Sequence, residues 1–104
     1  MSVIVDFSLF PMDKGESLSA YVAKILTMID KQGVDYQLTS MGTIVECDDL
    51  DTALKFVSEC YRQIEPDCGR VYATVNLDIR KGKTDRLRQK VKSVEQKMGK
   101  RANT

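Results

Sequence analysis

The chain has 104 residues, of which 42% are hydrophobic and 30% are charged, and its net charge is +1. This length allows one modest hydrophobic core, so we predict a single domain over residues 1–104. No apolar run approaches the roughly 18 residues that a membrane-spanning helix needs, and the N-terminus lacks the pattern of a signal peptide. We therefore expect a cytoplasmic protein without a membrane partner.

The ionisable residues argue against most forms of catalysis and metal binding. The chain has no histidine and three cysteines, Cys47, Cys60 and Cys68, which form no CxxC pair. Without an imidazole, the usual general base near neutral pH and most transition-metal sites are excluded. The odd number of cysteines argues against a disulfide framework. We expect free thiols, no metal site, no cofactor and no enzymatic activity.

The first predicted elements are a strand and an amphipathic helix. Residues 2–11 alternate in hydrophobicity, which predicts a strand whose buried face consists of Val3, Val5, Phe7 and Leu9. Helical spacing follows, with apolar positions at Leu18, Val22, Ile25 and Ile29. Ser17 is the expected N-cap of this helix, and Gly33 is its expected end.

A hairpin and a second helix come next. The predicted strands cover residues 36–39 and 43–47. The loop Ser40-Met41-Gly42 suits a type I turn that ends in a left-handed glycine. Asp48 or Asp49 then caps a helix whose apolar positions are Leu50, Ala53, Leu54, Val57, Tyr61 and Ile64.

The last predicted elements are a long strand and a basic helix. The strand covers residues 70–80, and its apolar face consists of Val71, Ala73, Val75, Leu77 and Ile79. Thr84 is the expected cap of the helix, whose apolar positions are Leu87, Val91, Val94 and Met98. The order of elements predicts an α+β fold, a ferredoxin-like βαββαβ sandwich with an extra C-terminal helix. Its four-stranded antiparallel sheet carries two helices on one face.

The other face of this sheet is predicted to be mixed. Its polar residues are Asp6, Ser8, Gln37, Thr39, Glu46, Thr74, Asn76 and Asp78, and its apolar residues are Ile4, Phe10, Ile44 and Tyr72. A solvated sheet face is polar in any case, which accounts for most of the first group. Mixed faces also suit an oligomer interface or the floor of a ligand site.

Three stretches of the chain share an order and spacing with a known family. They are SVIVDFSLFPMDKGESLSAYVAKI at residues 2–25, LTSMGTIVE at residues 38–46 and DIRKGKTDRLRQKVKSVEQKM at residues 78–98. Together they resemble the YkoF-like thiamine-binding protein family from Val3 to Met98. The resemblance implies a ferredoxin-like fold, assembly into dimers and tetramers, and no established catalytic activity. It also implies binding of thiamine or its hydroxymethylpyrimidine portion.

The resemblance points to a ligand site around the hairpin, with Ser8, Thr39, Met41, Gly42, Thr43 and Glu46 as candidates. Glu46 can exchange paired hydrogen bonds with an aminopyrimidine, and the hydroxyls can donate or accept. Gly42 permits close approach of the backbone, and Met41 is adaptable enough to lie over a flat ring. Structural explanations remain open: Glu46 as a solvated residue, the threonines as strand formers and Gly42 as a turn residue.

The charges are unevenly distributed, with ten of the 16 Lys and Arg residues in residues 80–104 and 13 of the 15 acids before them. An alternative function is therefore an oligomeric module that binds nucleic acid through its basic C-terminal helix. RNA-recognition modules stack bases on aromatic residues of their central strands, but residues 43–47 contain none. Asp6, Glu46 and Asp78 would also repel phosphate. We expect instead that the basic helix contacts an acidic surface within a homotetramer built from homodimers.

Overall fold

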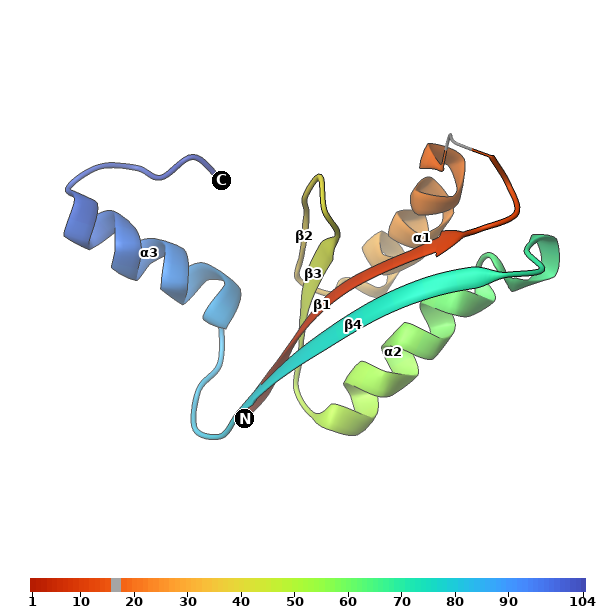
Figure 1. The fold of residues 1–104 in the computed structure, drawn as a ribbon. Coiled ribbons are helices and arrows are strands. Elements are labelled where there is room, and N and C mark those ends of the chain that lie inside the picture. The colour runs from red at the N-terminus through yellow and green to blue at the C-terminus, as the bar shows by residue number, and fades with distance from the viewer. Residues whose placement is uncertain (16–17) are drawn as a thin grey trace.

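The structure is a computed structural model that describes residues 1–15 and 18–104. Its strands are β1 (Ser2–Pro11), β2 (Tyr36–Leu38), β3 (Thr43–Cys47) and β4 (Val71–Arg80), which form one antiparallel sheet in the order β2-β3-β1-β4. Helices α1 (Ser19–Gln32) and α2 (Leu50–Arg62) lie against one face of this sheet, and α3 (Arg86–Met98) stands apart from both (Figure 1). The short helix η1 (Glu65–Asp67) follows α2. The predicted ferredoxin-like sandwich with an extra C-terminal helix is confirmed.

The core lies between β1 and the helices α1 and α2. The predicted inner face of β1 is buried, and its members Val3, Val5, Phe7 and Leu9 are at most 6% exposed. The helices contribute Ile25, Ile29, Ala53, Phe56 and Cys60 to the same cluster. The rings of Phe7 and Phe56 meet edge to face, with centroids 5.8 Å apart, which is a favourable aromatic geometry.

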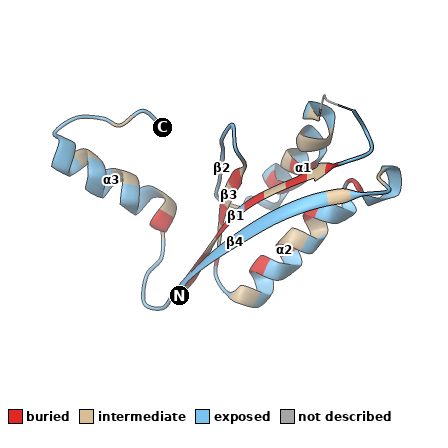
Figure 2. Cartoon of the chain, viewed as in Figure 1, coloured by how far each residue is buried: buried red, intermediate tan, exposed pale blue. Residues whose placement is uncertain are grey.

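The apolar face of β4 lies on the same side of the sheet, but it is not covered. The register pairs Val5 with Leu77 and Phe7 with Val75, so these side chains share the face of the core. Nevertheless Val75, Leu77 and Ile79 are 37%, 38% and 46% exposed. The helices pack over β1 and β3, and β4 is an edge strand that stays exposed along most of its length (Figure 2). An apolar strip is therefore left open to solvent.

Of the three predicted helix ends that lie within the described residues, two are confirmed and one is wrong. Gly33 ends α1 in the left-handed conformation, with φ 68°, and the Asp49 carboxylate accepts the Thr52 N–H at 2.7 Å. Ser17 lies outside the described residues. The prediction that Thr84 caps α3 is wrong, because the helix follows Asp85, which has φ 53°, and no side chain at that position caps it.

The molecule is longer than a compact domain of its size. Its radius of gyration is 15.1 Å and its extents are 46 × 29 × 22 Å, whereas a compact chain of this length has a radius of gyration of about 13 Å. The excess comes from α3, which projects away from the sandwich (Figure 1). Among the described residues, no helix combines the length and apolar character needed to cross a membrane.

Candidate ligand pocket

A pocket of about 300 Å³ opens between α1 and the loop that joins β2 to β3. We call it the hairpin pocket. It is lined by Phe7, Ser8, Leu9 and Phe10 of β1, by Leu18, Val22, Ile25 and Leu26 of the α1 region, and by residues 38–43. Most of this lining is apolar. Five of the six predicted ligand residues lie here, namely Ser8, Thr39, Met41, Gly42 and Thr43.

The floor of the hairpin pocket is the end of β1, where this strand loses one of its two neighbours. Pairing with β3 stops at Phe7, opposite Thr43, whereas pairing with β4 continues to Pro11, opposite Val71. From Ser8 onward, β1 therefore has a partner strand on one side only. Backbone groups on the other side have no sheet partner and can serve as donors and acceptors for a bound molecule.

The Thr39 hydroxyl shapes the hairpin loop and has no bonding capacity left for a ligand. It donates to the Gly42 carbonyl at 2.8 Å and accepts the N–H groups of Met41 at 3.2 Å and Gly42 at 3.1 Å. A hydroxyl has one proton and two lone pairs, so all three positions are used. Thr39 thus fixes the wall of the pocket, and it lies just outside β2, which ends at Leu38.

Gly42 is required by space rather than by an unusual backbone conformation. The prediction that it is left-handed is wrong, because Gly42 is not among the glycines with positive φ in the described residues. A Cβ added at Gly42 would lie 2.9 Å from the Phe7 carbonyl oxygen, closer than real Cβ atoms approach. The missing side chain lets the loop pass directly beside β1.

The remaining three candidates occupy different depths. Thr43 is 6% exposed and begins β3, whereas Met41 is 90% exposed and forms the rim. Ser8 is half-buried. Strand alternation places its side chain on the opposite face of the sheet from Phe7, so Ser8 lines the pocket only along the edge of β1. Thr43 is therefore the best placed hydroxyl, with Ser40 in the loop as an additional one.

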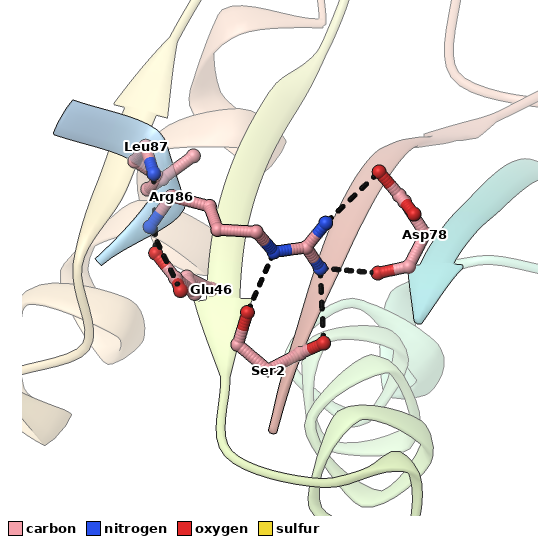
Figure 3. Close-up of polar contacts among 5 residues, drawn as sticks. All are labelled: Ser2, Glu46, Asp78, Arg86 and Leu87. Carbon is pink, nitrogen blue, oxygen red and sulfur yellow. Dashed lines mark hydrogen bonds and ion pairs between the residues drawn. The ribbon is translucent and has the colours of Figure 1, made fainter. Parts of the chain in front are cut away.

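Glu46 is separated from the other five candidates. Three residues along a strand span about 10 Å, and Glu46 and Thr43 point to opposite faces of the sheet. The Glu46 carboxylate accepts the backbone N–H groups of Arg86 at 3.1 Å and Leu87 at 3.2 Å (Figure 3). The expectation that it lies beside the Met41-Gly42 turn is wrong. Glu46 instead supplies the cap at the N-terminus of α3 that Thr84 was expected to provide.

These contacts also set the ionisation of Glu46. Partial burial of the carboxyl raises its pKa. Four other contacts lower the pKa and together have the larger effect: the N–H groups of Arg86 and Leu87, the Ser2 hydroxyl and the positive charge of Arg86. The net result is that the pKa of the Glu46 carboxyl lies below its ordinary value. The carboxylate is thus held ionised at the positive end of the α3 dipole.

Arg86 also joins the start of α3 to the sheet, and we call this contact region the α3 junction. Arg86 was not among the predicted residues. It is 9% exposed, and its guanidinium donates to the Ser2 hydroxyl at 2.7 Å, to the Ser2 carbonyl at 2.9 Å and to the Asp78 carboxylate at 3.0 Å (Figure 3). A further bond joins it to the Asp78 carbonyl at 2.6 Å. The basic helix is therefore fastened to the ends of β1 and β4.

The α1 wall of the hairpin pocket was also missed as a part of the site. Leu18, Val22 and Ile25 were predicted to be apolar, but only as members of the core. Helical periodicity identifies a buried face and does not distinguish a fully packed face from one that leaves a cavity. No local signal in the sequence marks these residues as pocket lining.

The fold and the hairpin pocket define a small ferredoxin-like α+β protein with a mainly apolar cavity at the edge of its sheet. The profile of the family described as thiamine-binding protein matches residues 5–95, and the chain belongs to that family. A UPF0045 protein of Methanocaldococcus jannaschii is 33% identical over 92 residues, which cover 88% of this chain and 91% of the relative. A UPF0045 protein of Mycobacterium bovis is 32% identical over 95 residues, which cover 91% of this chain and 93% of the relative.

Solved structures agree with the fold. The crystal structure of a hypothetical protein from M. jannaschii superposes with a TM-score of 0.78 at 32% identity, covering 89% of this chain and 95% of the other. A Thermotoga maritima protein named for thiamine biosynthesis or salvage superposes with a TM-score of 0.76, covering 90% of this chain and 99% of the other. At 20% identity, the second likeness concerns the fold alone.

Proposed function

We propose that the hairpin pocket binds the pyrimidine ring of thiamine or free hydroxymethylpyrimidine. In this proposal the protein is a non-catalytic carrier, store or sensor of that ligand. The observation that carries the proposal is the mainly apolar pocket at the one-sided end of β1, in a chain of the thiamine-binding protein family. Its volume of about 300 Å³ lies at the lower end of the range for small-molecule sites, which suits a single substituted ring.

The chemistry of the ring matches the groups that the pocket offers. An aminopyrimidine has flat apolar faces, ring nitrogens that accept hydrogen bonds and an exocyclic amine that donates. Backbone groups of residues 8–10 on the open side of β1 supply the complementary donors and acceptors. The Thr43 hydroxyl supplies another, and the side chains of Val22 and Leu26 cover the ring faces from α1.

The charge of the pocket favours the neutral part of the ligand. The described lining residues include no ionisable side chain, so the thiazolium cation and any phosphate gain no partner inside. A charged group is costly to bury without a partner. The pyrimidine therefore enters the pocket and the thiazolium extends past Met41 toward solvent. This lining also offers no acid or base for catalysis, which supports a binding role.

We also propose that the protein assembles as a homodimer and then a homotetramer, and that it acts in the cytoplasm. The apolar strip of β4, formed by Val75, Leu77 and Ile79, lies on an edge strand, and such edges pair readily with another chain. The three cysteines are free, with Cys47 and Cys60 buried, which suits a reducing compartment.

The test is calorimetric titration of the full chain with hydroxymethylpyrimidine, thiamine and thiamine diphosphate. Val22→Phe fills the pocket from α1, and we expect it to weaken pyrimidine binding by at least about tenfold. The matched control is Ala23→Phe at the next position, which is exposed and outside the lining, and we expect a change below about twofold.

A second variant tests the hydroxyl. Thr43→Val keeps the shape of the side chain and removes one hydrogen bond, so we expect a loss of roughly three- to tenfold. The proposal fails if neither pyrimidine ligand binds to the parent protein. It also fails if Val22→Phe binds these ligands as tightly as Ala23→Phe does.

A further inference from the structure

A second concave site lies on the opposite face of the sheet from α1 and α2. It is a cleft of about 740 Å³ between α3, the end of β4 and the segment that joins them. We call it the basic cleft, because six cationic residues line it, namely Arg80, Lys83, Arg86, Lys90, Lys92 and Lys97. Asp78 is the only carboxylate among the described lining residues. The hairpin pocket and the basic cleft share no residue.

Ion pairs within the single chain neutralise only a small part of the positive charge of the basic cleft. Asp78 pairs with Arg86 at 3.0 Å. Within residues 1–15 and 18–104, the other five cations of the cleft form no ion pair. Cations that face one concavity add their fields there and attract a counter-ion. This arrangement stabilises a bound anion more than scattered surface lysines would.

The cleft also has donors that can orient an anion. Gln89, Ser93 and Gln96 line it along α3, and their amide and hydroxyl groups can donate hydrogen bonds. Arg86 uses four of its five N–H groups on Ser2 and Asp78, which leaves one available. Lysines act as point charges toward phosphate, and several of them suit a compact, multiply charged group.

We propose that the basic cleft binds a diphosphate group, either as free pyrophosphate or as part of an organic ester. Its volume lies within the range of small-molecule sites. An extended nucleic acid is less well matched, because it needs cations along its whole length, whereas the cations of the cleft face one concavity. The proposal does not depend on pyrimidine binding in the hairpin pocket.

The test compares two triple variants of the full chain with the same change in net charge. Lys83→Gln, Lys90→Gln and Lys97→Gln together remove charge from the cleft. Lys14→Gln, Lys31→Gln and Lys55→Gln together remove it from exposed positions outside the cleft. Titration with inorganic pyrophosphate should show binding that weakens as salt rises. We expect the cleft variant to lose at least about tenfold in affinity and the control to stay within about twofold.

Further ligands distinguish the source of the group. If pyrophosphate binds and ADP does not, the ligand is the free anion. If ADP also binds, and its affinity falls as much in the cleft variant as that of pyrophosphate, the site accepts organic diphosphates. The proposal is overturned if pyrophosphate and ADP both fail to bind, or if the two triple variants lose affinity equally. It is also overturned if a single-stranded RNA binds more tightly than pyrophosphate and is lost in the cleft variant. If pyrophosphate does not bind and the cleft variant changes the mass of the assembly, the cleft is a subunit interface.

Discussion

Arg86 and Ser2 are 84 residues apart in the sequence and are joined by two hydrogen bonds. Arg86 Nε donates to the Ser2 hydroxyl at 2.7 Å, and Nη2 donates to the Ser2 carbonyl at 2.9 Å. Ser2 is 2% exposed and begins β1, while Arg86 begins α3. The start of β1 and the start of α3 are thus tied together through a buried guanidinium. This link fixes where the projecting helix leaves the sandwich.

Replacing Arg86 should loosen this junction more than replacing the neighbouring cation. Arg86→Leu removes four hydrogen bonds and leaves the Ser2 carbonyl without its partner, so we expect a loss of about 2–3 kcal/mol in the free energy of unfolding. The control is Arg88→Leu, whose pairs with Asp35 and Asp85 are exposed and worth below about 1 kcal/mol. Urea unfolding measures both. Equal losses would show that the buried contacts of Arg86 contribute nothing beyond a surface pair.

The contribution of Glu46 to stability should depend on pH. Its pKa is lower in the folded chain than the ordinary value of 4.5, because the Arg86 and Leu87 N–H groups outweigh the effect of burial. A lowered pKa contributes stability above the ordinary value and loses it as pH falls through the folded value. Glu46→Gln should therefore cost about 1 kcal/mol near neutral pH and progressively less as pH falls from 4.5 through the folded pKa.

The measurement is urea unfolding of the parent and Glu46→Gln across this range of pH. Glu65→Gln is the control, since it removes the same charge from an exposed position in η1. If the difference between the parent and Glu46→Gln stays constant as pH falls, the carboxylate is not the cap of α3. The hairpin pocket is distant from this junction, so pyrimidine binding should be retained in Glu46→Gln.

Adding a methyl group at Gly42 should strain the hairpin. The Cβ of Gly42→Ala would lie 2.9 Å from the Phe7 carbonyl oxygen, and backbone on both sides must shift to relieve it. We expect a loss of about 1–3 kcal/mol in the free energy of unfolding, as for other overpacked sites. Ser40→Ala, in the same loop and exposed, should cost below about 0.5 kcal/mol. Thermal unfolding that gives the same midpoint for both variants would contradict this explanation of Gly42.

The apolar strip of β4 should control assembly. Leu77→Lys places a charge in its centre, and we expect the chain to sediment as a smaller species than the parent. Leu54→Lys, on α2, replaces a leucine that is more exposed than Leu77 and should leave the mass unchanged. Light scattering measures both. A parent mass of 11.7 kDa, that of one chain, would show that the protein does not self-associate at all.

The sequence was sufficient for the parts of the fold that depend on neighbouring residues. Strand alternation identified the buried face of β1, and helical spacing with Gly33 identified α1, because both signals lie within a few residues. The ligand candidates came instead from the family resemblance, and five of the six line the hairpin pocket. Whether a ligand occupies that pocket remains a prediction.

The errors come from contacts between distant segments. Glu46 caps a helix that starts 40 residues later, and neither strand propensity nor the cap pattern around Thr84 reveals such a partner. Gly42 was explained by turn chemistry, whereas its neighbour in space is Phe7 on another strand. The exposure of Leu77 depends on how far two helices extend across a sheet. Tertiary packing determines all three, and local pattern does not encode it.

The difference in length between β1 and β3 determines whether this fold has the hairpin pocket. β1 continues to Pro11, although its pairing with β3 ends at Phe7, and the Thr39–Gly42 loop turns back at that point. A hairpin two residues longer on each strand would extend the ladder along β1 and occupy the open side. Insertion or deletion in this one loop could therefore create, resize or close the cavity while the packed core of β1, α1 and α2 stays the same. In this architecture, the gain or loss of a binding site is a matter of loop length rather than of redesigning the interior.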